Sequence, residues 1–300
     1  MISDLVAPGM RVLVQGLTGR AGRAQAAQMR RYGTNIVAGV SPRAETDVDG
    51  IPIYRTCAEA VGATGAQASV IIVPPPFVLD SIHDAAASSI KLIVAITEGM
   101  PIHDALKARA LVRQSGAIWI GASTPGLAIP GKIKLGFLPS VSLAPGSLGV
   151  MSKSGTLSYE VCHRLVSRGL GQSLWVGVGG DPVKGTRFAD LLPVFHNDPE
   201  TQAIVVVGEI GGNEEEELAE RIRESGFRKP VFALLAGKTA REGMTMGHAG
   251  ALIQDTSGTI ESKEAALRAA GAQVFPRIEE LAAAVARSVA SSAKAALCVG

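Results

Sequence analysis

The sequence predicts an α/β protein with two tandem domains, each built on a doubly wound parallel sheet. Short apolar runs alternate with helix-length segments along the chain, and this alternation lapses once before it restarts. The length of 300 residues suits two domains, and 47% hydrophobic residues allow each of them to bury a core. With 35 glycines and 4% aromatic residues, the chain favours close-packed helices and tight strand-to-helix turns.

The first half alternates segments of strand length with segments of helix length. The predicted strands are 11–14, 35–40, 69–73, 91–96 and 118–120. The predicted helices are 22–32, 57–63, 77–88 and 102–115. Strands that alternate with helices imply right-handed crossovers and hence a parallel sheet.

The alternation lapses between residues 121 and 146, where prolines and glycines punctuate the chain. It then restarts, with predicted strands at 148–151, 173–178, 203–207, 231–235 and 273–275. The predicted helices of this half are 156–168, 186–195, 214–224, 261–270 and 278–292. We therefore expect a first domain at 1–121, an ordered connecting loop at 122–146 and a second domain at 147–300.

Charge and composition exclude several classes of protein. The 29 basic and 27 acidic side chains leave a net charge of +2, too small for a protein that binds nucleic acid by bulk electrostatics. No apolar run approaches the roughly 18 residues of a membrane span, and the N-terminus lacks the apolar region of a signal peptide. Cys57, Cys162 and Cys298 form no CxxC pair, which argues against a disulfide framework or a zinc site. A cytoplasmic protein without a metal site or membrane contact is expected.

A run of four glutamates, at 214–217, coincides with a predicted helix start. Acidic side chains there offset the helix dipole, so we expect a solvated helix face.

The first predicted strand leads into a glycine-rich turn with Gly16, Gly19 and Gly22. This GxxGxxG spacing is a variant of the dinucleotide fingerprint, in which glycines let a phosphate approach a helix N-terminus. No acidic residue follows the second strand; the chain continues Ser-Pro-Arg, ending at Arg43. That favours a ligand with an extra phosphate, such as NADP or coenzyme A (CoA). A merely tight turn without a ligand is the alternative.

Two further turns follow predicted strands and open predicted helices. One contains Ser154, Gly155 and Thr156, and the other contains Glu209 within GEIGG. Each is either an anion-binding nest or an ordinary helix cap. Neither carries the GKS or GKT ending of a P-loop, so nucleotide hydrolysis by this chain alone is not expected.

His248 lies in a loop of small residues, MGHAGA, with open access to its ring. An imidazole so placed can be a nucleophile, a base or a ligand. No other candidate zinc ligands cluster with it. The remaining histidines lie in polar, helix-like settings and are expected at the surface.

These elements, in this order, resemble the alpha subunits of succinyl-CoA synthetase, in the nucleoside-diphosphate-forming acid–CoA ligase family. The matching segments are VQGLTGRAG (14–22), IVPPPF (72–77), ITEGMP (96–101), SKSGTLSYE (152–160), GVGGDPVKGTRFADLLPVF (177–195), NDPET (197–201), GEIGG (208–212) and MGHAGA (246–251). The resemblance implies an N-terminal Rossmann-like CoA-binding domain and a C-terminal flavodoxin-like ligase domain that carries a phosphohistidine.

The resemblance also implies a role for each matched residue. His248 would take up and pass on a phosphoryl group, and Glu209 would orient its ring. The implied CoA contacts are Thr18, Gly19, Arg20 and Ala21, together with Ile96, Thr97 and Glu98. The turn at Ser154, Gly155 and Thr156 would hold phosphate, and Tyr159 would lie near the substrate contacts.

The implied partner is an ATP-grasp beta subunit in a heterodimer or heterotetramer. It would bind ATP or GTP with Mg²⁺ and make the first phosphoryl transfer. A small carboxylic acid such as succinate and CoA would be the other reactants.

The chain departs from the family pattern in three places. The family's Gly-Pro-Asn-Cys-Pro-Gly loop stands here as GASTPG (121–126), so Ser123 and Thr124 take the Asn and Cys positions near the acid. The family's Pro-Gly-His segment stands as PSV (139–141), and its lysine after the second strand has no match, so that Arg43 becomes the candidate for the CoA phosphate. Malate, another dicarboxylate or a sulfonate-bearing acid are alternative substrates. A non-catalytic CoA-binding regulator and an NADP-dependent oxidoreductase are the alternative functions.

Overall fold

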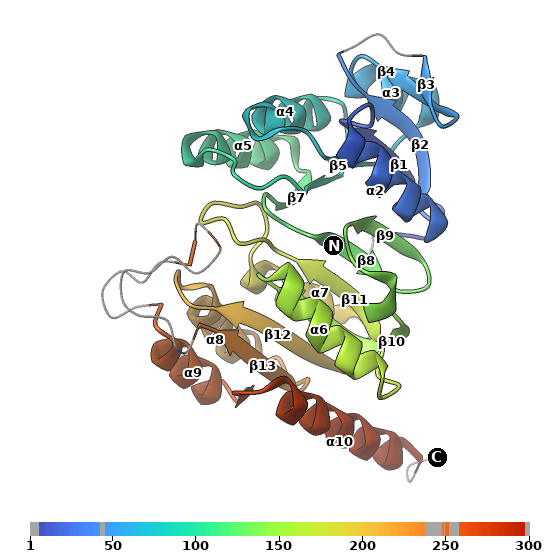
Figure 1. Cartoon of the computed structure of the whole chain (residues 1–300). Helices are drawn as coiled ribbons and strands as arrows, with labels where there is room; N and C mark the ends of the chain where they lie inside the picture. The colour runs from blue at the N-terminus through green and yellow to red at the C-terminus, as the bar shows by residue number, and fades with distance from the viewer. Residues whose placement is uncertain (1–5, 43–45, 238–247, 249, 252–257, 298–300) are drawn as a thin grey trace. The chain divides into compact units, whose positions relative to one another are not determined.

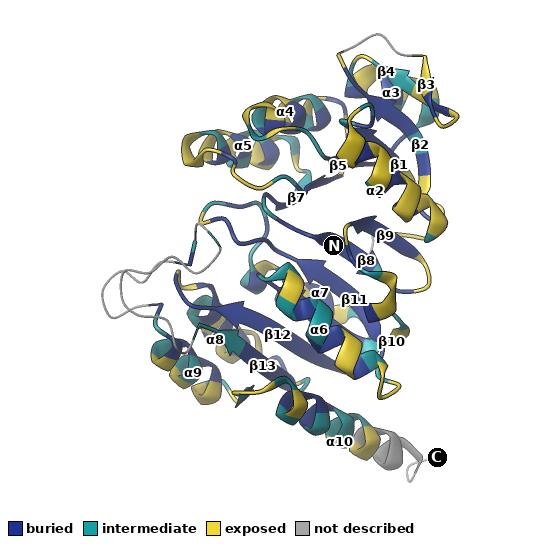
Figure 2. Ribbon diagram, viewed as in Figure 1, coloured by how far each residue is buried: buried dark blue, intermediate teal, exposed yellow. Residues whose placement is uncertain are grey.

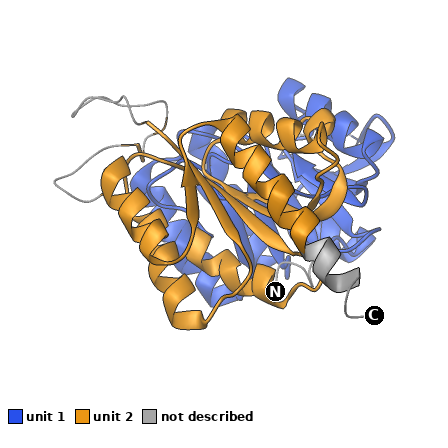
Figure 3. Cartoon of the chain, turned by 90° about the horizontal axis from the view of Figure 1, so that it is seen from below, with its two compact units in different colours: residues 1–138, 177–186 blue, residues 139–176, 187–300 orange. Residues whose placement is uncertain are grey.

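The computed structural model of the chain divides into two compact units, coloured separately in Figure 3. The first unit comprises Met1–Leu138 and Gly177–Thr186, and the second comprises Pro139–Val176 and Arg187–Gly300. The structure describes residues 6–42, 46–237, 248, 250–251 and 258–297, with side chains up to residue 291 in the last helix. The domain boundaries at 121 and 147 stay predictions.

The first unit is built on a seven-stranded sheet with the order β3-β4-β2-β1-β5-β6-β7 (Figure 1). Its strands are β1 (Arg11–Gln15), β2 (Asn35–Val40), β3 (Asp47–Val48), β4 (Ile51–Tyr54), β5 (Ala68–Ile71), β6 (Leu92–Ala95) and β7 (Ile118–Gly121). Only the short edge strand β3 pairs antiparallel, with β4. The other strands are parallel and follow the 3-2-1-4-5-6 order of the Rossmann fold. The α/β class predicted from the alternation is confirmed.

Helices cover both faces of this sheet. They are α2 (Arg20–Arg31), α3 (Cys57–Thr64), α4 (Val78–Ala87) and α5 (Ile102–Ser115), with a short 3₁₀ turn η1 (Pro75–Phe77) before α4. Helices α3, α4 and α5 pack side by side, and α2 packs on β1 and β2. Helix α2 begins at Arg20 rather than at the predicted Gly22, because Gly19 is its N-cap. Arg20 and Ala21 therefore belong to its first turn.

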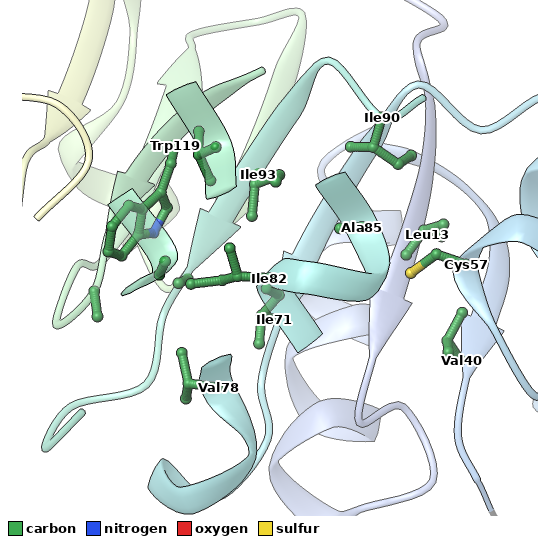
Figure 4. Close-up of a cluster of buried hydrophobic side chains, with 14 of the residues drawn as sticks. Leu13, Val40, Cys57, Ile71, Val78, Ile82, Ala85, Ile90, Ile93 and Trp119 are labelled. Atoms are coloured by element: carbon green, nitrogen blue, oxygen red, sulfur yellow. The ribbon is translucent and has the colours of Figure 1, made fainter. Parts of the chain in front are cut away.

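The core of the first unit lies between its sheet and α4 (Figure 4). Ile82 and Ala85 of α4 contact a cluster that includes Ile71, Ile93 and Trp119 from three neighbouring strands, and each of the five is at most 1% exposed. This packing fixes the strands whose carboxyl ends carry the candidate CoA contacts.

A β-hairpin occupies part of the segment expected to be a connecting loop. Strands β8 (Gly126–Ile129) and β9 (Ile133–Gly136) pair antiparallel, and β9 packs on α2. The Thr34 hydroxyl donates a hydrogen bond of 2.6 Å to the carbonyl of Lys134. The prolines and glycines that suggested a loop lie mostly around these short strands.

The strands of the second unit follow the order β14-β13-β12-β10-β11. They are β10 (Pro145–Ser152), β11 (Gln172–Gly177), β12 (Ala203–Glu209), β13 (Val231–Ala236) and β14 (Gln273–Phe275). Counted along the chain, this is the 2-1-3-4-5 order of the flavodoxin-like fold. Strand β12 is buried along its whole length, and its first five residues are apolar (Figure 2).

Two groups of helices flank this second sheet. They are α6 (Gly155–Val166), α7 (Phe188–Asn197), α8 (Glu214–Ser225), α9 (Ile260–Ala269) and α10 (Ile278–Leu297), with a 3₁₀ turn η2 (Ser140–Ser142) before β10. Helices α7, α8 and α9 pack in a row, whereas α6 packs with α10. No helix in the described part of the chain is long and apolar enough to cross a bilayer.

The glutamate run at the start of α8 is not a solvated face, so that prediction was wrong. Glu214 is 4% exposed and Glu215 is fully buried. Their partners are distant in sequence: Glu214 accepts a hydrogen bond from the backbone N–H of Phe188, and Glu215 pairs with Lys153 and Lys263. A local sequence pattern could not reveal these partners.

Candidate active site

Three loops leave the second sheet at one edge. Strand β12 pairs in parallel with β10, aligning Val207 with Ser152, and with β13, aligning Glu209 with Ala236. The chain order of the sheet reverses between β10 and β12, and ligands of doubly wound sheets bind outside the carboxyl ends of the strands at such a point.

At this edge, His248 contacts Glu209. The imidazole Nδ1 lies 2.7 Å from Glu209 Oε2, and the two side chains are 24% and 8% exposed. Since Nδ1–H is the atom that can donate to a carboxylate, the ring lone pair is at Nε2. The buried carboxylate thus favours the tautomer with the proton on Nδ1 and the lone pair on Nε2.

The turn after Glu209 is held by close contacts. Gly208 has no room for a side chain, because a Cβ there would lie 2.4 Å from Glu215 Oε1. The N–H of Gly211 donates to the carbonyl of Gly258 at 2.8 Å. Ile210 packs in a small buried cluster with Ala251 and Ile260. These contacts join the turn to the described residues that follow His248.

The turn between β10 and α6 contains Ser154, Gly155 and Thr156. Ser154 is the N-cap of α6, and its hydroxyl accepts a hydrogen bond of 3.3 Å from the N–H of Leu157. The first turn of α6 holds no acidic residue, and Thr156 is exposed. The helix N-terminus therefore presents backbone N–H groups and positive dipole at the edge where β12 ends.

Tyr159 lies on α6, one turn further along. Its ring centroid is 6.3 Å from that of Trp175. Burial raises the pKa of Tyr159 to about 12, so the phenol keeps its proton at neutral pH.

In the first unit, the glycine-rich turn brings α2 very close to the sheet. Gly16 has φ of +86°, and a Cβ there would lie 2.3 Å from the carbonyl oxygen of Ile72. A Cβ on Gly22 would lie 2.1 Å from the carbonyl oxygen of Gly16. Gly19 caps α2 without a side-chain hydrogen bond, and the first turn of α2 holds no acidic residue. The two glycines thus let α2 pack tightly on the sheet, and the α2 N-terminus presents backbone N–H groups, as anion-binding turns do.

The other predicted CoA contacts lie at the carboxyl edge of the same sheet. Thr18 Oγ1 lies 3.3 Å from Ser41 Oγ, and the Thr97 hydroxyl donates to the carbonyl of Val73 at 2.6 Å. Ile96 is buried, whereas Gly19, Arg20, Ala21 and Glu98 are exposed. Arg43 lies outside the described residues.

Ser123 and Thr124 differ in how their hydroxyls are used. Thr124 is 3% exposed, donates to the carbonyl of Gly177 and accepts from the N–H of Gly126 at 2.9 Å. Ser123 is half-buried, with φ of +55°, and its hydroxyl has no hydrogen-bond partner among the described residues. Thr124 therefore holds the loop, and Ser123 has the hydroxyl that is available to a ligand.

Sequence reasoning missed a buried charge cluster beside the His248–Glu209 pair. Lys153 Nζ lies 3.0 Å from Glu215 Oε2, and the Lys263 ammonium contacts the same oxygen. The side chains of Lys263 and Glu215 are fully buried, and that of Lys153 is 5% exposed. Lys153 could have been noticed between a strand and a helix, but no sequence signal marks Lys263. Within the described residues, no group of three His, Cys, Asp or Glu side chains could hold a metal ion.

Comparison with known proteins places the chain in a family. The family model of the CoA binding domain matches residues 9–99, and that of CoA-ligase matches residues 151–273. Succinate–CoA ligase [ADP-forming] subunit alpha 2 of Archaeoglobus fulgidus is 50% identical over 277 residues, covering 92% of this chain and 96% of the relative. The chain belongs to the family of succinate–CoA ligase alpha subunits. The resemblance drawn from the motifs is thereby confirmed, and NADP chemistry is not retained.

Other members of this alpha-subunit family show how wide it is. The Aquifex aeolicus succinate–CoA ligase [ADP-forming] subunit alpha is 46% identical, covering 94% of this chain and 93% of its own length. Subunit SauD of the ADP-forming sulfoacetate–CoA ligase of Bilophila wadsworthia is 42% identical, covering 91% of this chain and 94% of its own length. Among solved structures, ATP citrate lyase from Methanothrix soehngenii shares the fold, with a TM-score of 0.84 at 24% identity. That match covers 93% of this chain and 50% of the lyase chain.

Proposed function

We propose that the chain is the alpha subunit of an ADP- or GDP-forming acid–CoA ligase and that His248 is its phosphoryl carrier. The contact between His248 Nδ1 and Glu209 carries this proposal. It lies in the segment matched by the CoA-ligase model and at the sheet position where doubly wound folds bind ligands.

In the proposed reaction, His248 Nε2 forms a bond to the γ-phosphorus of ATP or GTP and the nucleoside diphosphate leaves. The N–P bond then breaks as a carboxylate oxygen of the acid attacks phosphorus, which gives an acyl phosphate and restores the imidazole. The CoA thiol finally displaces inorganic phosphate and forms the thioester. Glu209 keeps Nδ1 protonated and offsets the positive charge on the ring.

The turn at Ser154, Gly155 and Thr156 would receive the phosphoryl group. Its helix N-terminus favours an anion, and β10 lies beside the strand that carries Glu209. Tyr159, one turn along the same helix, would contribute a neutral hydroxyl group near the substrate. An excess of basic side chains is not needed, because backbone N–H groups would hold the phosphate.

CoA would bind in the first unit. The α2 N-terminus, which follows the tight turn of Gly16 and Gly22 and has no acidic residue in its first turn, suits a phosphate group. The residues that would hold CoA are Thr18, Gly19, Arg20, Ala21, Arg43, Ile96, Thr97 and Glu98. CoA would supply the thiol that accepts the acyl group.

A beta subunit with an ATP-grasp fold would bind ATP or GTP with Mg²⁺, in a heterodimer or heterotetramer. The relatives named as alpha subunits support a partner chain of this kind. We place the chain in the cytoplasm, where the free thiols of Cys57 and Cys162 would be stable.

Succinate is the proposed acid, and a sulfonate-bearing acid is the second candidate because of the sulfoacetate–CoA ligase relative. Malate or another dicarboxylate is a further candidate acid, with Ser123 and Thr124 as the residues expected near it. An acid screen with the co-expressed beta subunit decides among them.

The proposal is tested by incubating the co-expressed subunits with γ-labelled ATP. The wild-type alpha chain should acquire phosphate that is stable to alkali and labile to acid, and His248→Asn should acquire none. His196→Asn is the control, since His196 lies at the end of α7. Undiminished label on the His248→Asn chain would contradict the assignment. A chain that binds CoA but never takes label would instead be a CoA-binding regulator.

A further inference from the structure

The Glu215 carboxylate connects the His248–Glu209 pair to two buried lysines. Oε1 accepts a hydrogen bond of 3.1 Å from the backbone N–H of Glu209. Oε2 accepts a hydrogen bond of 3.0 Å from Lys153 Nζ and another from Lys263 Nζ. One carboxylate therefore bonds to the backbone of the residue whose side chain holds His248.

The two lysines come from elements on either side of the turn that follows Glu209. Lys153 precedes α6; its backbone N–H donates to the carbonyl of Val207 at 3.0 Å and its Nζ to that of Gly211 at 3.4 Å. Lys263 lies on α9, the helix that follows the His248 loop, and its Nζ lies 3.6 Å from Glu216 Oε2. Segments from three parts of the chain thus converge on the Glu209 turn.

A second glutamate of the same helix secures the returning end of the loop. Glu216 Oε1 accepts hydrogen bonds from the N–H of Gly258 at 3.3 Å and from the hydroxyl of Ser262 at 3.0 Å. The first turn of α8 therefore binds both the Glu209 turn and the start of α9. The carboxylates of this helix turn therefore hold backbone segments in place instead of being solvated.

The charges in this cluster depend on each other. Burial alone would raise the pKa of Glu215, but Lys153 and Lys263 outweigh it and hold this pKa below its ordinary value. Burial opposes the charge of Lys153, but Glu215, Glu214 and Glu209 together raise its pKa. Both groups are ionised at neutral pH, and neutralising one of them leaves the other as a buried charge without full compensation.

We propose that Glu215, held between Lys153 and Lys263, is a positioning residue that fixes the Glu209 backbone so that the Glu209 carboxylate engages His248 Nδ1. Its catalytic consequence rests on the proposed function, but the His248–Glu209 hydrogen bond itself can be measured without turnover. Glu215→Gln is the most informative variant. Its amide has a single acceptor oxygen, whereas both the two lysines and the Glu209 N–H need an acceptor. The NH₂ group of the glutamine must face either the lysines or the Glu209 N–H, so the hydrogen bonds on that side are lost.

The test is the Nδ1–H resonance of His248 in the full chain labelled with ¹⁵N-histidine, assigned by its absence in His248→Asn. Wild type should show a strongly downfield, exchange-protected signal. Glu215→Gln should lose the signal or move it upfield while the remaining fingerprint is kept. Glu217→Gln is the matched control on the same helix; it removes a pair with Arg187, 2.8 Å apart, and should leave the signal unchanged. A folded Glu215→Gln chain with the wild-type signal would overturn the proposal.

If Glu215→Gln fails to fold, Lys263→Met tests the same proposal. This variant removes one of the two lysine contacts of the Glu215 carboxylate and keeps the contact with Lys153. An unchanged His248 signal in a folded Lys263→Met chain would equally overturn the proposal. With the beta subunit present, Glu215→Gln should lower kcat about tenfold or more and leave KM for CoA within about twofold. Wild type that shows the resonance but takes no phosphate would refute the proposed function and leave the positioning role standing.

Discussion

His248 donates a hydrogen bond from Nδ1–H to Glu209 Oε2 over 2.7 Å, and the carboxylate that accepts this hydrogen bond is almost fully buried. A buried carboxylate stabilises an imidazole that gains positive charge, as it does when Nε2 takes up a phosphoryl group. Glu209→Gln removes this charge and keeps the shape. We expect the rate of His248 phosphorylation to fall by about 10²- to 10⁴-fold, as for other histidines that lose an orienting carboxylate.

Single-turnover labelling with γ-labelled ATP and the beta subunit measures that rate. Glu217→Gln should label at the wild-type rate, because Glu217 pairs with Arg187 away from the histidine. A Glu209→Gln chain that labels as fast as wild type would show that the carboxylate has no part in the transfer.

The glycine-rich turn of the first unit should not tolerate a methyl group at Gly22. A Cβ there would lie 2.1 Å from the Gly16 carbonyl oxygen, so α2 must move away from β1. Gly22→Ala should lower the melting temperature and weaken CoA binding by tenfold or more, an order of magnitude expected from lost phosphate contacts. Calorimetric titration with CoA and thermal unfolding measure the two effects.

Gly62→Ala is the matched control for Gly22→Ala. Gly62 lies within α3, and a Cβ there would meet no atom within 4 Å. This substitution should stabilise the chain by about 0.5–1 kcal/mol through helix propensity and leave CoA affinity unchanged. Equal loss of CoA affinity in both variants would contradict a phosphate-binding role of the glycine-rich turn.

Ser123 and Thr124 should respond differently to loss of their hydroxyls. Thr124→Val breaks hydrogen bonds with Gly177 and Gly126 in a buried place and should cost about 1–3 kcal/mol of stability. Ser123→Ala should leave stability within about 0.5 kcal/mol and change KM for the acid. Chemical denaturation and acid titration of the holoenzyme separate the two. A change in KM for the acid that accompanies only Thr124→Val would reverse these roles.

The buried charge cluster predicts a pH dependence of stability. The pKa of Glu215 is lower in the folded chain than the ordinary value of 4.5, even though burial alone would raise it, because Lys153 and Lys263 favour the charged form. Its stabilising contribution is therefore complete above the unfolded pKa and is lost as the pH falls through the folded pKa. Urea unfolding from pH 7 down to about 2 should show this loss in wild type and a shallower one in Glu215→Gln. If the free energy of unfolding fell equally with pH in the two chains, the stabilising role of the ion pairs of Glu215 would be contradicted.

The described cysteines should be inert in the native chain. Burial raises the pKa of Cys162 to about 12, and burial together with Asp84 raises the pKa of Cys57 further. Both thiols should resist alkylation at pH 7–8 until the chain unfolds, because the thiolate is the reactive form. Peptide mapping after iodoacetamide treatment checks this. Modification of either residue without denaturant would show that the fold opens there.

The fold was predictable because its strands and helices carry their own signals. The apolar run of β12 and the glycine turn before α2 are local in sequence, and they sufficed to predict the fold class and the tight turn before α2. The hairpin β8–β9 was not predictable from periodicity, since its strands are short and surrounded by glycine and proline.

The candidate site was predictable only in part, for a related reason. His248 and Glu209 were marked by the glycines around them and by the family motifs. Lys263 and Glu215 were not, because a lysine and a glutamate on two helices look like surface residues until the fold buries them together. The error over the 214–217 run has the same cause: burial of charge depends on partners distant in sequence.

Glu209 and His248 lie 39 positions apart in the sequence, and their contact requires β12 and the segment that follows β13 to come together. A chain whose second sheet is unfinished or misassembled cannot hold the imidazole in the tautomer with its proton on Nδ1. The histidine resonance therefore serves as a folding reporter. The time course of its recovery during refolding would show when this sheet forms. Its intensity in a purified sample would give the fraction of correctly folded molecules before any beta subunit is added.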